Sequence, residues 1–301
     1  MKKLRTYLLA ASVGGLILFT GCIKTEDPTA PEKDQYAGNQ SLQKSGANCV
    51  TPPSGLISWW PGDGNADDIV GGNHGTLMNG ATFAPGMVAQ AFSLDGVDDI
   101  VSVGTTGFPT GASARTAALW VKLDPSDYLT TGFSYGSEYW GGGFAILPAY
   151  WGPPSPAPDG TLQFTAFGSG YDLFTGISLR DNQWHHVAAT YDGSEIVLYL
   201  DGVSVASRSI ALNTGTASGA CIGARCVSHT FLTGRVDEVA LWNRDLSASE
   251  IQSIFDAGTA GMCKVVTICH KPGTPAQKTL VIPIQALAGH LGHGDTIGHC
   301  E

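Results

Sequence analysis

The chain has 301 residues, of which 16 are Lys or Arg and 26 are Asp or Glu, so its formal net charge is −10. An acidic chain without a cluster of basic side chains is unsuited to the phosphates of nucleic acid, which excludes that class of partner. Its 40 glycines and 14% charged residues indicate many tight turns and favour an all-β protein.

The first segment, 1–21, has the form of a signal peptide. Basic residues precede an uncharged apolar run at 7–20, which is shorter than the roughly 20 residues of a membrane-spanning helix. The run ends in Gly21-Cys22, which resembles the lipobox of bacterial lipoproteins. The resemblance implies that Cys22 is diacylated and anchors the chain to a membrane. Because Ile23, not Asp, follows it, we expect a place in the bacterial cell envelope at the outer membrane.

The next segment, 22–48, is polar, contains two prolines and has few large apolar side chains. Such a composition cannot bury enough surface to offset its ordering entropy. We expect a flexible tether between the membrane and a folded domain.

The segment 49–263 is predicted to be a single β domain. Its clearest pattern is an alternating strand at 184–191 followed by two Asp-Gly pairs, Asp192-Gly193 and Asp201-Gly202, each between β-branched runs. Asp-Gly pairs are typical of two-residue hairpin turns, so this region predicts a three-stranded antiparallel meander. Many short strands separated by turns predict a two-sheet sandwich or jelly roll.

Six short motifs occur in an order that makes the fold more specific. They are Leu56-Ile57-Ser58-Trp59-Trp60, Asn73-His74-Gly75-Thr76-Leu77, the segment 91–99, Trp184-His185-His186-Val187-Ala188, Tyr199-Leu200-Asp201-Gly202 and Gly234-Arg235-Val236-Asp237-Glu238-Val239. Together they resemble the laminin-G-like, concanavalin A-like jelly roll of bacterial surface proteins. A closing helix near 247–251 matches too, with Ser247 and Glu250 placed as a capping box.

The resemblance leaves catalysis open, because some jelly-roll relatives hydrolyse β-glucans with a Glu-x-Asp-x-x-Glu motif. That motif is absent from this chain. Asp237 and Glu238 are adjacent, so on a regular strand they point to opposite faces and cannot serve as a catalytic pair. We therefore expect a protein that is not an enzyme.

The acidic loop 62–68 suggests calcium, which prefers oxygen ligands from turn-rich loops. Asp63 and Asp67 are the candidate ligands from the loop, with Asn65 secondary. The resemblance adds Asp237, because the family often carries a structural calcium between such a loop and the Asp of its last strand. The alternative is a solvated acidic turn that caps its own backbone.

The stretch 132–160 is rich in aromatic residues, Gly and Pro and is interpreted as a long functional connection. Aromatic faces stack on sugar rings or anchor protein contacts. Four residues of this stretch are the candidate ligand anchors, namely Tyr139, Trp140, Tyr150 and Trp151. The alternative is that the rings pack over an open end of the sandwich.

Six cysteines remain besides Cys22, an even number that suits an oxidising compartment. Cys49 and Cys263 flank the β domain, whose terminal strands should meet, so we expect them to pair. Two further disulfides are expected, Cys221–Cys226 across a small loop and Cys269–Cys300 around the C-terminal segment.

The segment 264–301 is predicted to be a second, small unit. It is similar to a short module with Cys and His found at the ends of bacterial extracellular proteins. His270, His290 and His293 are candidate zinc ligands, with Asp295 and His299 nearby in sequence. The alternative is that the disulfide alone holds the unit and the histidines bond to backbone.

Two function classes follow. The first is a non-catalytic lipoprotein that presents the domain for binding a glycan or a protein. The second is a structural cell-envelope protein without a specific ligand, and a glycoside-processing enzyme is a distant third.

Overall fold

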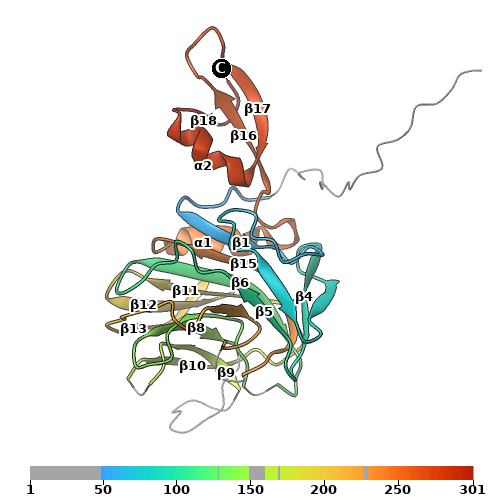
Figure 1. The fold of residues 1–301 in the computed structure, drawn as a ribbon, viewed down its shortest axis with the longest axis vertical. Helices are drawn as coiled ribbons and strands as arrows, with labels where there is room; N and C mark the ends of the chain where they lie inside the picture. Colours follow the sequence, from blue (N-terminus) through green and yellow to red (C-terminus); the bar gives the residue numbers. More distant parts are fainter. Residues whose placement is uncertain (1–48, 128, 149–159, 169, 227–229, 301) are drawn as a thin grey trace, which may run out of the picture. The chain divides into compact units, whose positions relative to one another are not determined.

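The computed structural model describes residues 49–127, 129–148, 160–168, 170–226 and 230–300. Two antiparallel sheets form a sandwich, which confirms the predicted all-β jelly-roll class (Figure 1). Across the larger, eight-stranded sheet the strands are β13 (Val203–Ser209), β12 (Glu195–Leu200), β11 (His185–Tyr191), β6 (Arg115–Leu123), β15 (Thr233–Trp242), β4 (Gln90–Asp95) and β3 (Thr82–Pro85), and β1 (Leu56–Trp60) pairs with β15.

The second sheet has seven strands and lies against the first, as the stacked layers of Figure 1 show. In order they are β10 (Asp172–Ser178), β9 (Thr161–Thr165), β8 (Gly143–Leu147), β7 (Phe133–Gly136), β14 (Ala220–Ile222), β5 (Ile100–Val103) and β2 (Gly75–Met78). A large apolar core lies between the sheets and takes alternate residues of their strands, which is the period-two pattern of a pleated strand.

The hairpins follow the local signals in the sequence. β11 pairs with β12 and β12 with β13, with Asp192-Gly193 and Asp201-Gly202 at the two turns. Asp201 has a φ of 50° and Gly202 a φ of 82°, the left-handed geometry that this pair accommodates at low cost. The predicted meander is confirmed.

The helix α1 (Ala248–Asp256) covers the outer face of the eight-stranded sheet. The Ser247 side chain accepts the Glu250 N–H, and the Glu250 side chain accepts the Ser247 N–H. The predicted capping box is therefore present. Ile251 and Ile254 pack with Trp59 and Trp242 in a second apolar cluster. A short 3-10 helix, η1 (Gly258–Ala260), follows.

The stretch 132–160 differs from the predicted long connection. Its described part contains β7 and β8, whose residues are all buried, and Phe133, Tyr135 and Phe144 belong to the core between the sheets. Both strands are short and buried on both faces, so the alternation of Phe133, Ser134 and Tyr135 is too brief to distinguish a strand from a loop. The interpretation as one loop was wrong for these residues.

The three predicted disulfides, Cys49–Cys263, Cys221–Cys226 and Cys269–Cys300, are all present. Next to the first, a parallel bridge joins Val50 to Met262, so the two ends of the β domain are also held by backbone. After Cys263 the chain forms a three-stranded sheet and a helix. These are β16 (Val265–His270), β17 (Lys278–Pro283), β18 (Thr296–Ile297) and α2 (Ile284–Gly292). No helix among the described residues is long and apolar enough to cross a membrane.

Candidate functional site

The most exposed large aromatic ring of the described chain is the indole of Trp140, in the turn that joins β7 to β8. Its exposed fraction is 71%, and that of neighbouring Tyr139 is 50%. A methyl group added to Gly168 would lie 2.7 Å from two indole carbons, so one face of the ring rests directly on the glycine backbone. The rest of the indole is largely exposed and offers an apolar surface.

Two further rings hold the neighbouring turn in place. Phe167 packs so closely on Gly143, and Tyr171 on Gly141, that neither glycine has room for a side chain. The Gly141 N–H donates to the Phe167 carbonyl at 3.2 Å, which links the β7–β8 turn to the β9–β10 turn. The glycine-rich sequence is therefore what lets the aromatic rings approach the backbone.

A polar cluster lies beside these rings on the outer face of β9 and β10. The Thr165 hydroxyl donates to Asp172 Oδ1 at 2.5 Å, and Gln163 also hydrogen-bonds to Asp172. Burial raises the pKa of Asp172, and the hydrogen bond from Thr165 opposes that rise. Gln163 is buried, and its Oε1 has no hydrogen-bond partner within the described ranges.

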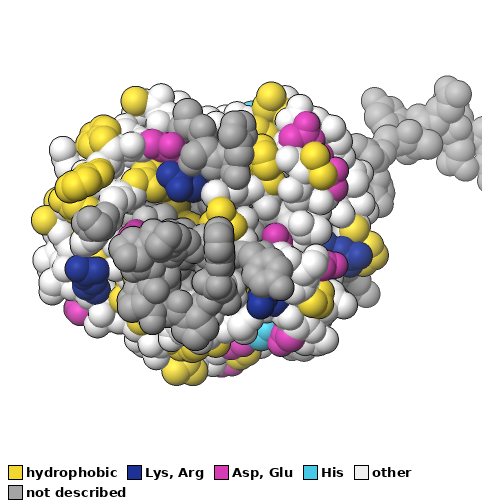
Figure 2. Space-filling view, turned by 90° about the horizontal axis from the view of Figure 1, so that it is seen from below, with side chains coloured by type: hydrophobic (Ala, Val, Ile, Leu, Met, Phe, Trp, Pro, Cys, Tyr) yellow, Lys and Arg dark blue, Asp and Glu magenta, His cyan; other side chains and the backbone are white. Residues whose placement is uncertain are grey.

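Two arginines add positive charge to the same region. The Arg225 guanidinium lies 4.1 Å from the centre of the Phe167 ring and 3.2 Å from a Glu138 carboxylate oxygen. Arg208 of β13 donates to the Asp172 carbonyl at 2.6 Å. Figure 2 shows a face on which hydrophobic side chains lie next to charged ones of both signs. We call Tyr139, Trp140, Tyr171, Asp172, Glu138 and Arg225 the turn platform.

The turn platform combines an exposed ring with partly exposed carboxylates and a guanidinium. Such a surface suits a ligand that has one apolar face and hydroxyl groups at its edge. Of the predicted ligand anchors, the structure places Tyr139 and Trp140 here. Tyr150 and Trp151 lie outside the described residues, as does the predicted lipidation site Cys22.

The predicted calcium residues separate into two groups. Asp63 lies near Asp237, and its negative charge raises the pKa of Asp237. The Asn65 side chain accepts the Asp67 N–H at 3.0 Å, and Asp67 Oδ1 lies 3.3 Å from His74 Nδ1. Asn65 thus contacts Asp67, Asp67 contacts His74, and the Asn65 bond to the Asp67 backbone is typical of a self-capping acidic turn.

Asp237 is joined by its neighbour Glu238, contrary to the expectation that they point to opposite faces. β15 has a bulge between Asp237 and Ala240, and Glu238 has a φ of 52°, so the strict alternation of the strand is lost there. Burial raises the pKa of both carboxyl groups, and for Asp237 the charge of Glu238 raises it further. Trp59 Nε1 donates to Glu238 at 2.9 Å.

This carboxylate cluster offers the oxygen ligands that calcium prefers. Asp237 Oδ1 is buried and has no hydrogen-bond partner in the described chain, while Oδ2 accepts the Val88 N–H at 2.9 Å. A lysine ammonium is already present, because Lys264 pairs with Asp63 and lies 3.4 Å from Glu238 Oε1. Asp63, Asp237 and Glu238 are not among the groups of described residues whose ligand atoms all lie within 4.8 Å of one another, and Lys264 already supplies a positive charge to them.

Comparison with known proteins identifies the β domain. A family model described as the concanavalin A-like lectin/glucanases superfamily matches residues 95–252. The chain belongs to this superfamily. The laminin-G-like resemblance seen in the sequence is thereby confirmed for residues 95–252.

Two solved members of this fold superpose on the chain. Domain 4 of an extracellular GH43 arabinanase from Geobacillus stearothermophilus, solved in complex with arabinotriose, has a TM-score of 0.55 and 21% identity, over 67% of this chain and 98% of that one. The binding domain of Paraclostridial Mosquitocidal Protein 1 has a TM-score of 0.53 and 15% identity, over 67% of this chain and 52% of that one. At these identities the likeness concerns the fold, and a search of curated proteins found no match.

The superfamily's sheets bring together residues that the sequence analysis did not select. Gln163, Thr165 and Asp172 come from two strands, and Arg225 follows β14 far along the chain. The alternation Thr161-Leu162-Gln163-Phe164-Thr165 was a usable signal, because it places polar groups on one face of a strand. Nothing local in the sequence indicates that Arg225 lies over Phe167.

Proposed function

We propose that this chain is a non-catalytic, lipid-anchored protein of the bacterial cell envelope that binds a glycan at the turn platform. The observation that carries the proposal is the Trp140 indole, which is 71% exposed yet seated on the Gly168 backbone. A fully exposed ring has few contacts that order it. The Trp140 ring instead contacts the Gly168 backbone before any ligand binds. Pre-organised aromatic faces bind at a small entropic cost.

A neutral glycan is the ligand class that these groups favour. The pyranose or furanose ring has apolar C–H faces that stack on an indole, and its hydroxyls suit Asp172, Glu138 and Arg225 as acceptors and donors. The net charge of −10 disfavours a polyanion. The arabinanase domain of similar fold was solved with arabinotriose, and we extend that kind of ligand to this chain as part of the proposal.

The absence of catalysis is proposed from how the platform's carboxylates are engaged. Glu138 is ion-paired with Arg225, and Asp172 Oδ1 accepts the Thr165 hydroxyl. A glycosidase needs one carboxyl group to give a proton and a second to attack or to activate water. Within the turn platform both carboxylates thus already have partners in the chain. We expect no new reducing ends when the chain is incubated with arabino- or gluco-oligosaccharides.

The test is a glycan array followed by titration of the best hit with the full chain in detergent. Trp140→Ala should weaken binding about fivefold or more, because truncating an aromatic anchor of an interface costs more than about 1 kcal/mol. Val97→Ala is the matched control, since Val97 is 70% exposed on another turn and should bind like the parent. Unfolding temperatures of both variants should stay close to that of the parent.

Three results would contradict the proposal. Equal binding by Trp140→Ala would move the site elsewhere, and a large fall in its unfolding temperature would make the ring structural. An empty array would favour the alternative, a cell-envelope protein that spaces other components without a specific ligand.

The membrane anchor is proposed from the sequence. Cys22→Ser should release the chain from the membrane fraction, because a thioether-linked lipid at that residue would be lost. Retention of the variant in the outer-membrane fraction would contradict lipidation at Cys22.

A structural calcium ion at Asp63 and Asp237, which the family resemblance implies, stays a prediction. It would compete there with the Lys264 ammonium, since both neutralise the same carboxylates. Chelation should therefore lower the unfolding temperature of the parent. It should leave Asp237→Ala unchanged, and an unchanged parent would contradict the calcium site.

A further inference from the structure

The C-terminal unit, residues 264–300, gathers side chains that the turn platform does not use. Four of the chain's eight histidines lie in this short segment, namely His270, His290, His293 and His299. Two of them meet the buried carboxylate of Asp295. His270 ends β16, His290 lies in the last turn of α2, and Asp295 precedes β18, so three separate elements converge.

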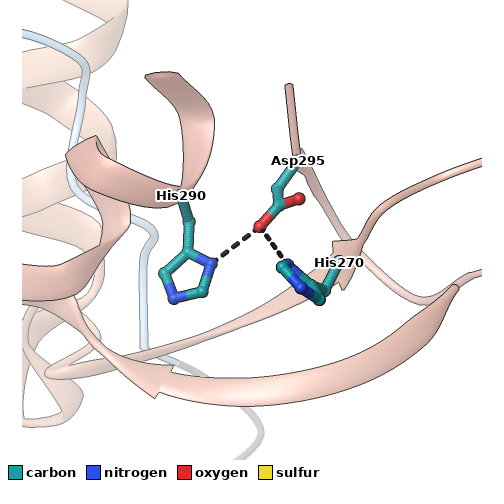
Figure 3. Close-up of side chains that lie close together, drawn as sticks. All are labelled: His270, His290 and Asp295. Carbon is teal, nitrogen blue, oxygen red and sulfur yellow. Dashed lines mark hydrogen bonds and ion pairs between the residues drawn. The ribbon is translucent and has the colours of Figure 1, made fainter. Parts of the chain in front are cut away.

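Both imidazoles present the same nitrogen to the same oxygen, as Figure 3 shows. His270 Nδ1 lies 2.8 Å from Asp295 Oδ2, and His290 Nδ1 lies 2.7 Å from that oxygen. The three ligand atoms all lie within 4.8 Å of one another. The His270 and His290 ring planes are nearly perpendicular, at 81°, so the two nitrogens approach the oxygen from different directions.

Further hydrogen bonds hold Asp295 and its carboxylate in place. Its other oxygen, Oδ1, accepts the Lys271 N–H at 2.9 Å, and the Asp295 N–H donates to the His290 carbonyl at 3.1 Å. The Asp295 side chain is 1% exposed, whereas those of His270 and His290 are 31% and 28% exposed. Metal ligands commonly have such supporting hydrogen bonds, which fix the direction of the donor atom.

We propose that His270 Nδ1, His290 Nδ1 and Asp295 Oδ2 bind a divalent transition-metal ion, of which Zn²⁺ is the best match. Two nitrogens and one carboxylate oxygen are typical zinc ligands, whereas calcium prefers oxygen alone. Zinc takes such donors at about 2.0–2.2 Å in a tetrahedral shell, where two ligand atoms lie roughly 3.3–3.5 Å apart, so the present Nδ1–Oδ2 separations need to open by about 0.6 Å. Water completes the shell through the exposed side of the imidazoles.

Proton balance is simple in this site. A neutral imidazole that donates through Nδ1 moves that proton to Nε2 when Nδ1 takes the metal, and an imidazolium releases one proton to solvent. The carboxylate is already the acceptor of both bonds and enters the site without gaining or losing a proton.

The ion would fasten α2 to β16 and to the segment before β18. Units below about 40 residues usually need a disulfide or a metal besides their apolar core. The Cys269–Cys300 disulfide holds the two strand ends. The metal would in addition attach α2, which contains neither cysteine of that disulfide. His293 was a predicted ligand, but the described structure groups Asp295, not His293, with His270 and His290.

The experiment is calorimetric titration of Zn²⁺ into the full, metal-free chain in detergent. One strong site is expected in the parent, and His270→Gln or His290→Gln should each lose about 100-fold or more in affinity, beyond the roughly 10–100-fold cost of losing a supporting residue. His293→Gln is the matched control and should bind like the parent. Zinc absorption fine structure should report two imidazole nitrogens and oxygen at about 2.0–2.2 Å.

Folding is followed separately, so that a damaged variant is recognised. Peptide mapping should find Cys269–Cys300 intact in every variant, and Zn²⁺ should slow amide exchange in β16 and α2 of the parent and of His293→Gln only. A parent without a stoichiometric site overturns the proposal, and the cluster is then a hydrogen-bond network alone. Full zinc affinity in both His270→Gln and His290→Gln overturns it as well.

Discussion

The Cys49–Cys263 disulfide should stabilise the domain more than Cys221–Cys226, and the reason is the length of chain that each one closes. Their sequence separations are 214 and 5 residues. In the chain-entropy account, a cross-link restricts the unfolded chain in proportion to the logarithm of the loop length. That account gives about 5 kcal/mol for the long loop and about 2 kcal/mol for the short one.

The perturbation is a pair of double variants, Cys49→Ala with Cys263→Ala and Cys221→Ala with Cys226→Ala. Urea unfolding of the oxidised full chain, followed by tryptophan fluorescence, gives the free energy of unfolding of each. The first pair should lose about 3 kcal/mol more than the second. Its urea dependence should also steepen, because an unfolded chain without the long cross-link exposes more surface. Equal losses in the two pairs would refute the loop-closure reasoning.

Three further substitutions test what stabilises the β domain. Burial lowers the pKa of His186 to about 4 from 6.5, so its contribution to stability is present above pH 6.5 and is lost as the pH falls through 4. Between pH 7 and pH 4, the free energy of unfolding of His186→Gln, measured with urea, should therefore fall by about 3 kcal/mol less than that of the parent. The same pH dependence in both proteins would contradict this. Ser247→Ala removes the helix cap and should cost about 1 kcal/mol by the same measurement, whereas no change would show that the cap is dispensable. Arg115→Met should lower the free energy of unfolding by about 3 kcal/mol or more, because the fully buried guanidinium donates to several backbone carbonyls that would lose their partner. An unchanged free energy of unfolding would show that water replaces the guanidinium.

The sequence predicted the features that depend on neighbouring residues. The turns at Asp192-Gly193 and Asp201-Gly202 and the capping box of Ser247 and Glu250 are confirmed, because each rests on backbone geometry within a few residues. The disulfides were predictable for a related reason. Cys49 and Cys263 flank the sandwich domain and are brought together by its ends, whereas Cys221–Cys226 and Cys269–Cys300 each close a shorter segment.

Burial on two faces hid part of the fold from the sequence. β7 and β8 are entirely buried and only four and five residues long, and the many glycines around them make the region resemble a loop. Only the packing of the two sheets separates Phe133 and Phe144, which are core, from Trp140, which is exposed. The sequence therefore indicated an aromatic surface but not which rings compose it.

The tertiary structure alone decided the geometry of the candidate sites. Glu238 joins Asp237 because a bulge breaks the alternation of β15, and a bulge depends on the partner strand as much as on the residue itself. Asp172 meets Thr165 across a strand pair, Arg225 reaches Phe167 from the loop after β14, and Asp295 meets two histidines of other elements. Composition and motifs determined that this chain is an acidic β-sandwich with paired cysteines. Contacts between distant residues determined where it can bind, because side chains far apart in sequence are brought within bonding distance only by the packing of the whole chain.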